Sequence, residues 1–214
     1  MSLDLNPAAA GTIGDIAQLE ALVGSPKQTS VAKESVGMTE LEQEFVRQSP
    51  FYLLSTAAPD GTCDVSPRGD PPGSVWVACD RTLILADRPG NRRLDSLRNI
   101  VANPHVGLLF LVPGGDETLR INGRAHLTTH ESILGRLVVD GKRPKLAIVV
   151  HTEQVYMHCA RAFLRSKLWK PETWPERGSI PQMPAIFKEK LCLAGSIEEI
   201  AAEREGRYQT EPLF

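Results

Sequence analysis

Residues 86–97 read Ala86-Asp87-Arg88-Pro89-Gly90-Asn91-Arg92-Arg93-Leu94-Asp95-Ser96-Leu97. This stretch follows an apolar run, turns at Pro89-Gly90, places two arginines side by side and then takes up helical spacing. Backbone N–H groups at the start of a helix attract anions, and guanidinium groups match phosphate oxygens in pairs. The pattern therefore predicts a strand, a tight turn and a helix start that together hold a small anion. Two solvated surface arginines are the alternative at this point.

The composition narrows the class of protein. The chain has 214 residues, a formal net charge of −2, and 42% hydrophobic and 23% charged residues, which is ordinary for a soluble globular protein. A near-neutral chain does not favour nucleic-acid binding, so its clustered arginines favour a small anionic ligand. There is no apolar run of about 18 residues and no basic segment followed by an apolar core at the N-terminus. We therefore expect a cytoplasmic protein without a membrane partner.

The cysteines and histidines do not indicate a metal site. No two of the four cysteines have the C-x-x-C spacing, so we expect reduced, partly buried thiols. His126 and His130 are four residues apart, but His126 falls in a predicted strand and no third ligand follows from the spacing. Neither a dinucleotide-binding nor a nucleophile-elbow motif is present.

The order of the predicted elements indicates an antiparallel barrel. Thr39 and Glu42 form a capping box at the start of one helix. Further helices are expected at 13–23, 91–101, 131–139, 159–170, 187–193 and 197–203, and strands at 51–57, 63–66, 75–77, 82–85, 106–112, 117–128 and 146–158, with a bulge at Asn122-Gly123. Because the strands recur with short turns, the fold class is mainly β with helices (α+β). We expect a six- to seven-stranded antiparallel split β-barrel with peripheral helices. Residues 1–37 form an N-terminal extension, 38–170 the main domain, and 171–214 a proline-rich segment with a helical tail.

Several arginines recur beside glycine, proline, serine and asparagine, namely Arg68, Arg92, Arg93, Arg120 and Arg165. Each one alone is more readily a surface residue or an ion-pair partner. Their repeated occurrence beside turns favours the hypothesis that they bind one shared anionic ligand.

With these residues in view, the chain resembles a known family, the pyridoxamine 5′-phosphate oxidase-like, FMN-binding split β-barrels. The resemblance covers about residues 38–170. It depends on an ordered set of stretches: residues 51–56, 60–61, 66–70 (Ser-Pro-Arg-Gly-Asp), 89–93 (Pro-Gly-Asn-Arg-Arg), 103–110, 119–125 (Leu-Arg-Ile-Asn-Gly-Arg-Ala) and 158–169. The last stretch resembles a particular bacterial subgroup.

The resemblance implies a homodimer that binds FMN in a groove at the subunit interface. It implies that Arg92 and Arg93, with Asn91 and Ser96 nearby, bind the phosphate. It places Val65, Ser66, Pro67 and Arg68 along the isoalloxazine ring and Ala86 and Asp87 beside the ribityl chain, and it implies that Thr118 comes from the other subunit. The basic and aromatic C-terminal signature of the oxidase itself cannot be mapped here, which argues against vitamin B6 oxidation.

The function that the resemblance implies is an FMN-dependent oxidoreductase. It would act on a small organic substrate through hydride transfer at flavin N5, with NAD(P)H as the candidate donor. The alternatives are a flavin carrier or redox sensor without turnover, a haem- or deazaflavin-binding member of the same fold, and a protein-interaction module. The absorbance spectrum and its response to NAD(P)H separate these classes.

Overall fold

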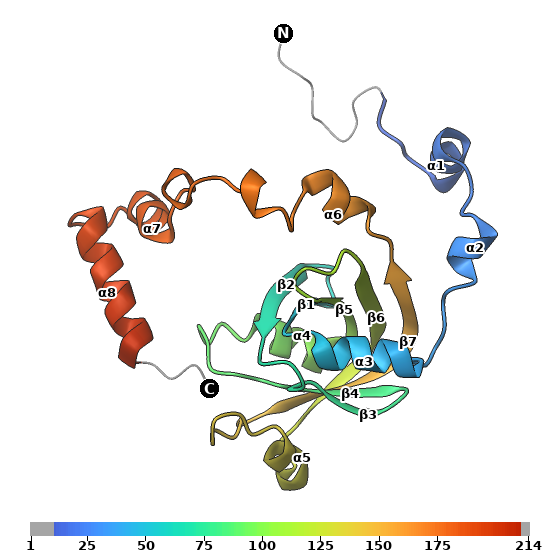
Figure 1. Cartoon of the computed structure of the whole chain (residues 1–214), viewed down its shortest axis with the longest axis horizontal. Helices are drawn as coiled ribbons and strands as arrows, with labels where there is room; N and C mark the ends of the chain where they lie inside the picture. The colour runs from blue at the N-terminus through green and yellow to red at the C-terminus, as the bar shows by residue number, and fades with distance from the viewer. Residues whose placement is uncertain (1–10, 211–214) are drawn as a thin grey trace. The chain divides into compact units, whose positions relative to one another are not determined.

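The computed structural model describes residues 11–210, and its centre is one seven-stranded sheet (Figure 1). The strands are β1 (Phe51–Ala57), β2 (Cys63–Gly69), β3 (Trp76–Cys79), β4 (Thr82–Ala86), β5 (His105–Leu111), β6 (Thr118–Thr128) and β7 (Ala147–His158). Their order is β2-β1-β5-β6-β7-β4-β3, and every neighbouring pair is antiparallel. The sheet is not closed, because β2 and β3 are both edge strands. The predicted α+β split barrel is confirmed.

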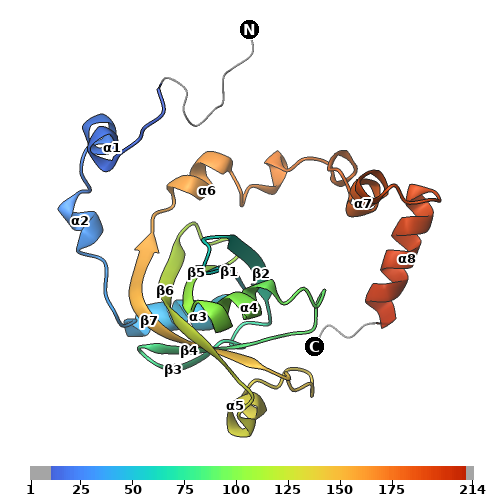
Figure 2. The same cartoon turned by 180° about the vertical axis from the view of Figure 1, so that it is seen from behind.

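Helices surround this sheet. Those around the barrel are α3 (Glu40–Gln48), α4 (Asp95–Ala102), α5 (Glu131–Arg136) and α6 (Arg161–Ser166). The predicted capping box is present in α3, where the Thr39 and Glu42 side chains each accept a bond from the other's backbone N–H. Helix α3 packs against β3 and β6 and lies in front in Figure 1, while α4 packs against β1, β2 and β6 and lies in front in Figure 2.

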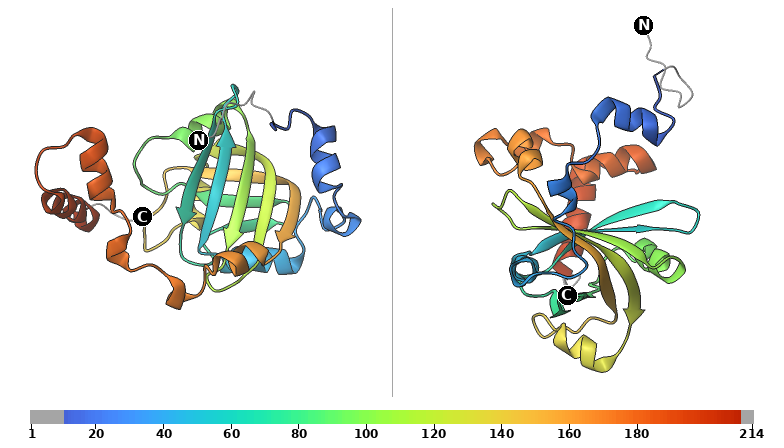
Figure 3. Two further views of the ribbon diagram at one scale, coloured as in Figure 1. Left: turned by 90° about the horizontal axis from the view of Figure 1, so that it is seen from above. Right: turned by 90° about the vertical axis from the view of Figure 1, so that its right-hand side faces the viewer.

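The sheet curls so that one face, the inner face, encloses the core. Figure 3 shows β1, β2 and β5 in one layer and β3 and β4 in the other, with the long strands β6 and β7 bending through both. The fully buried side chains of the inner face include Leu54, Leu83, Phe110, Ile121 and Val150. A second, smaller apolar cluster lies on the opposite side of β4 and β7, where Leu134 and Leu137 cover Ile84, Ala86, Ala147 and Val149. Burial therefore alternates along β1 and β5, as expected for strands with one covered face, while β4 and the first half of β7 are buried on both faces.

The long pair β6–β7 carries the predicted irregularity at Asn122-Gly123. Asn122 lies opposite Gln154 and Gly123 lies opposite Thr152, so the extra residue is Glu153 on β7. A Cβ atom on Gly123 would clash with the His151 carbonyl oxygen and would lie 3.0 Å from its carbonyl carbon. The glycine is therefore required by the close approach of the two backbones.

Three local expectations were wrong. Helix α4 begins at Asp95 instead of residue 91, because Arg92 and Leu94 have φ values of 56° and 64°, which a right-handed helix excludes. Helix α6 ends at Ser166, because Lys167 has a φ of 53°. All four cysteines are exposed, since Cys63 and Cys79 terminate edge strands and Cys159 and Cys192 flank helices.

The residues before Ser35 form a unit of their own, with α1 (Ile16–Val23) and α2 (Gln28–Val31). The carboxylate of Asp15 caps α1 by accepting a bond from the Gln18 N–H, and Gly24 ends it with a φ of 80°. After α6, two short 3-10 turns (Pro171–Thr173 and Arg177–Ser179) precede α7 (Met183–Leu191) and α8 (Ile197–Thr210), which pack on each other. Within residues 11–210, no helix has both the length and the apolar character that crossing a bilayer requires.

Candidate functional site

A run of hydrogen-bonded polar groups, here called the polar seam, follows the edge strand β2. It consists of Asp64, Ser66, Arg68, Asp87 and Ser96. Arg68 donates from Nε to Ser66 Oγ (3.1 Å) and from Nη1 to Asp87 Oδ1 (2.8 Å). Ser96 Oγ donates to Asp64 Oδ2 (2.6 Å), and the two serine hydroxyls are 3.2 Å apart. Because the Ser96 proton goes to the carboxylate, Ser66 donates to Ser96, and the chain of bonds runs from Arg68 to Asp64.

The polar seam joins three segments that the family resemblance assigns to one ligand. Asp64, Ser66 and Arg68 lie on alternate positions of β2, so their side chains share the inner face. Asp87 is the first residue after β4, and Ser96 is in the first turn of α4. The part of β2 expected beside the ring therefore lies next to the residues expected beside the ribityl chain and the phosphate.

A second ion pair holds the loops around the seam. Arg88 donates from Nε to both carboxylate oxygens of Asp70 (3.0 and 2.9 Å) and from Nη2 to the Leu137 carbonyl (3.0 Å). This clamp connects the loop after β2, the loop after β4 and the end of α5. Sequence reasoning missed it, because Asp70 and Arg88 lie in two different loops and only the folding of the sheet brings these loops together.

Tyr52 lies on the inner face opposite Arg68 in the β1–β2 register. Its ring is buried and lies 5.1 Å from the ring of Phe110. Burial raises the pKa of the Tyr52 phenol far above its usual value of 10, and the nearby charges of Arg68, Asp70, Asp87 and Arg88 largely oppose one another. The floor of the polar seam is thus a neutral, desolvated aromatic ring.

The paired arginines lie in an exposed loop just before α4. The Asn91 side chain accepts a bond from the Arg93 N–H (3.0 Å), and Arg93 Nε donates to Asp95 Oδ2 (2.7 Å). This hydrogen bond and ion pair with Asp95 raise the pKa of Arg93. Arg92 adopts the left-handed conformation and makes no side-chain hydrogen bond or ion pair with the described part of the chain. Sequence reasoning placed these residues inside the helix, but they precede it.

The start of α4 has the donors that an oxyanion needs. Its N-cap residue, Leu94, provides no side-chain cap, and the first-turn N–H groups have no backbone acceptor among residues 11–210. Two guanidinium groups and these amides form a donor set that fits a phosphate. Asp95 is the opposing feature, because its carboxylate already pairs with Arg93.

Four further predicted residues belong neither to the polar seam nor to the loop of the paired arginines. Val65 and Pro67 alternate with its members on β2, so their side chains are exposed on the other face of the sheet. The Ala86 side chain is buried in the second apolar cluster, which leaves only its backbone for a ligand. Thr118 is buried on the central strand β6, opposite Leu111 and His158, and β1 and β5 separate it from β2.

The outer face is the side of β2, β1, β5 and β6 that turns away from the core. Across its middle lie Pro67, Leu53, Leu109 and Arg120, followed by Tyr156 on β7. The Arg120 guanidinium lies 4.9 Å above the Tyr156 ring, and its buried Nε has no hydrogen-bond partner in the described chain. Arg120 is therefore a half-buried cation beside aliphatic side chains, and one of its N–H donors lacks the acceptor that buried polar groups normally have.

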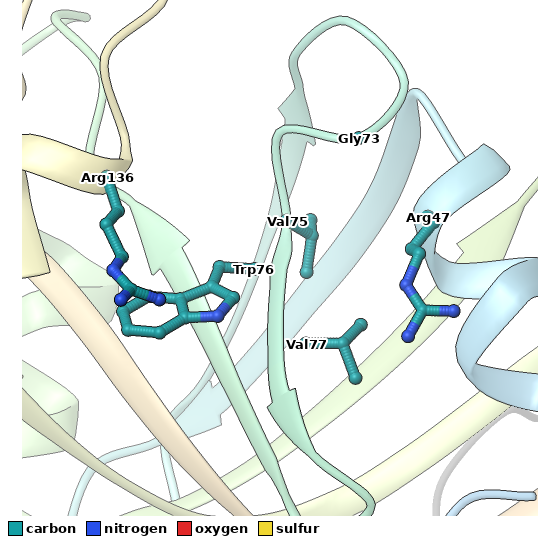
Figure 4. Close-up of a pocket in the computed structure, with 6 residues that line it drawn as sticks. All are labelled: Arg47, Gly73, Val75, Trp76, Val77 and Arg136. Carbon is teal, nitrogen blue, oxygen red and sulfur yellow. The ribbon is translucent and has the colours of Figure 1, made fainter. Parts of the chain in front are cut away.

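A recess of about 300 Å³ lies elsewhere, along β3 (Figure 4). It is lined by Arg47, Gly73, Val75, Trp76, Val77 and Arg136, and none of the residues expected to bind flavin takes part.

The open antiparallel sheet that curls around a core places this chain in the class of split β-barrels. The chain belongs to the pyridoxamine 5′-phosphate oxidase family, since the family model with that description matches residues 38–159. This confirms the resemblance seen in the sequence. No curated protein matches the chain.

Solved structures similar to this chain are distant in sequence. HupZ from Group A Streptococcus is 19% identical with a TM-score of 0.45, over 55% of this chain and 91% of that one. A protein related to general stress protein 26, of the pyridoxinephosphate oxidase family, from Clostridium acetobutylicum is 15% identical (TM-score 0.41; 55% and 84%). An FMN-binding protein from Syntrophomonas wolfei is 14% identical (TM-score 0.40; 55% and 88%).

Proposed function

We propose that this chain is an FMN-binding flavoprotein that works as an oxidoreductase on a small organic substrate. One observation carries the proposal: the polar seam brings β2, Asp87 and Ser96 together, although 19 positions separate Arg68 from Asp87 and 30 separate Ser66 from Ser96. The family supports a flavin as the ligand of such a site.

For the phosphate, the proposal assigns Arg92, Arg93 and the uncapped N-terminus of α4. Arg92 makes no ion pair with the described residues and supplies a full charge. To bind the phosphate, Arg93 would have to share or break its ion pair with Asp95. This costs little, because exposed ion pairs contribute little to stability. The Ser96 hydroxyl is already committed to Asp64, so we expect its backbone N–H to contribute instead of its side chain.

For the ring, the proposal assigns the free edge of β2 and the Arg68 guanidinium. Among residues 11–210, strand β2 pairs only with β1, so its other edge leaves backbone N–H and C=O groups for a ligand. Arg68 is already paired with Asp87, which offsets part of its charge. We therefore expect Arg68 to orient the ligand and to tune its electrostatics moderately.

The flavin would supply hydride chemistry at N5, with a nicotinamide as the donor candidate. The residues of this chain would bind and orient the flavin and exclude water from it, and no side chain need serve as an acid or base. Tyr52 stays neutral under the seam, because burial raises the pKa of its phenol.

We also propose that the chain forms a homodimer through the outer face. Exposed Val65 and Pro67 share this face with Arg120, whose Nε has no partner in the described chain. Arginine and aromatic residues within an apolar surface are typical of the central part of an interface. A second copy would cover the apolar side chains and bring an acceptor to Arg120.

The phosphate assignment is tested with Arg92→Ala combined with Arg93→Ala. Each charge-assisted hydrogen bond contributes about 1.5–3 kcal/mol. We therefore expect the FMN dissociation constant, measured by quenching of FMN fluorescence, to rise by about 100-fold or more. The control is Arg98→Ala, because Arg98 is also exposed but lies further along α4, and it should bind FMN normally. Normal affinity in the double variant would refute the phosphate assignment.

The absorbance spectrum tests the cofactor and the reaction separately. Purified protein should show flavin absorption, and anaerobic NAD(P)H should bleach it if the chain turns over. Absorption that persists would identify a carrier or sensor, and a Soret band would identify a haem protein.

A further inference from the structure

The edge strand β3 is open along one side. It pairs with β4 through one edge only, and among residues 11–210 no backbone group of Val75, Trp76 or Val77 bonds to any other segment. The recess of about 300 Å³ lies along this strand. Free N–H and C=O groups beside a recess form a template for one further strand.

Two arginines flank the strand, one on each face. Figure 4 shows Arg136 and Trp76 on one side of β3, and Val75, Val77 and Arg47 on the other. Arg136 comes from α5, and its guanidinium lies 4.5 Å above the Trp76 ring. Arg47 comes from the last turn of α3. The side chains of an added strand would alternate between these two faces.

The two arginines differ in how much of their charge is free. Arg47 Nη1 lies 3.4 Å from the Glu44 carboxylate, and Arg47 Nη2 donates to the Gln43 side chain. The Arg47 and Glu44 side chains are 41% and 52% exposed. Arg136 makes no ion pair with a described residue, and stacking on Trp76 restricts its side chain. Arg136 is therefore the stronger and better ordered site for a carboxylate.

We propose that β3 is a docking strand for an extended segment of another protein that carries two acidic residues in succession. Adjacent residues of a strand point to opposite faces, so one carboxylate would reach Arg136 and the other Arg47. The backbone of the segment would pair with β3, and a small apolar side chain beside the acidic pair would contact the half-buried Val77, since Val75 belongs to the core. This interaction is independent of the flavin proposal, because no predicted flavin residue lines the recess.

A second copy of this chain does not fit the same edge. Two β3 strands pairing edge to edge would bring the arginines of both copies together, and like charges oppose that arrangement. The chain's own two acidic pairs do not supply such a segment, because Glu198-Glu199 is in the first turn of α8 and Asp116-Glu117 lies in the short connection between β5 and β6. Charge therefore selects an acidic segment of a different protein.

The test uses the full-length protein and short fluorescent peptides of about six residues. One peptide has Thr and Val around a central Asp-Glu pair, and the control peptide has Asn-Gln in its place. Fluorescence anisotropy should show saturable binding of the acidic peptide only. Arg136→Gln should weaken it by about five-fold and Arg47→Gln by about two-fold, the range that exposed ion pairs give. Arg161→Gln, an exposed arginine of α6, should leave the peptide affinity unchanged.

Backbone pairing is tested with N-methylated peptides. Only alternate N–H groups of an added strand face β3, so methylation at every second residue should abolish binding, while methylation between those positions should be tolerated. No binding up to about 1 mM peptide would overturn the proposal and leave the arginines as protection against edge-to-edge pairing. Binding that is equal in all variants, or insensitive to the methylation pattern, would also overturn it.

Discussion

Single residues carry the strictest requirements of this fold, and Gly123 is the clearest case. It lies beside the bulge where Glu153 is the extra residue of β7. Its own backbone passes so close to His151 that no Cβ fits. The sequence pointed to this position through the Asn-Gly pair, but only the register of β6 and β7 explains why a larger residue fails there.

Gly123→Ala should lower the free energy of unfolding by about 3 kcal/mol, because the new methyl group meets rigid backbone. Urea denaturation measures the loss. Gly135→Ala is the matched control, since the space around Gly135 is open and alanine favours the helix, so its stability should rise by about 0.5–1 kcal/mol. Equal stability of both variants would contradict the packing seen at the bulge.

Tyr52 predicts an alkaline limit to stability. Its pKa is raised in the folded state, so the folded chain keeps the phenol proton at a pH where the unfolded chain loses it. The contribution of the Tyr52 phenol to the free energy of unfolding is complete below the usual pKa of 10. It decreases above that pH, by up to about 1.4 kcal/mol per pH unit. Tyr52→Phe lacks this dependence. Between about pH 9 and pH 11, the unfolding free energy of the wild type should therefore fall relative to that of Tyr52→Phe. Parallel curves would refute the assignment.

At the scale of elements, a buried ion pair connects the loops that lie around the polar seam. Asp70 and Arg88 are 13% and 11% exposed, and with Leu137 they join β2, β4 and α5 at their ends. This clamp holds the loop that continues to Arg92 and Arg93. The position of the proposed phosphate site therefore depends on a pair outside it.

Asp70→Asn should destabilise the chain by about 3 kcal/mol, because a buried guanidinium loses its charged partner. Glu131→Gln is the control, since the pair of Glu131 with Arg143 is exposed and contributes about 0.5 kcal/mol or less. Thermal unfolding measures both. We also expect weaker FMN binding in Asp70→Asn, because its loop is released. A stability equal to that of the control would show that the clamp does not operate.

At the scale of the whole molecule, the surface of the sheet is unevenly covered. Helix α5 and the second apolar cluster cover the outer side of β4 and β7, while the outer face of β2, β1, β5 and β6 keeps apolar side chains exposed. In the proposed homodimer, this uncovered part is the interface. The division of the chain at residues 37 and 170 stays a prediction.

Val65→Asp tests the interface. Val65 is 59% exposed in the single chain, so a carboxylate there should not disturb folding but should oppose burial against a second copy. We expect a monomer by light scattering, where the wild type is a dimer. Val101→Asp is the control, because Val101 is 76% exposed on α4, outside the outer face, and its variant should stay dimeric. A dimeric Val65→Asp protein would move the interface elsewhere.

The sequence by itself determined the local order of this protein. Strand alternation, the Thr39–Glu42 capping box and the irregularity at Asn122-Gly123 depend on residues close in the chain, whose mutual geometry follows from backbone periodicity. Only the tertiary structure decided the polar seam, the Asp70–Arg88 clamp and the separation of Thr118 from β2. Those contacts depend on how the sheet curls, which is set by packing of the whole core and not by any spacing along the chain. In the stretch 86–97, the turn and the arginines could be predicted from the sequence. The late start of the helix and the residues that this stretch contacts could not.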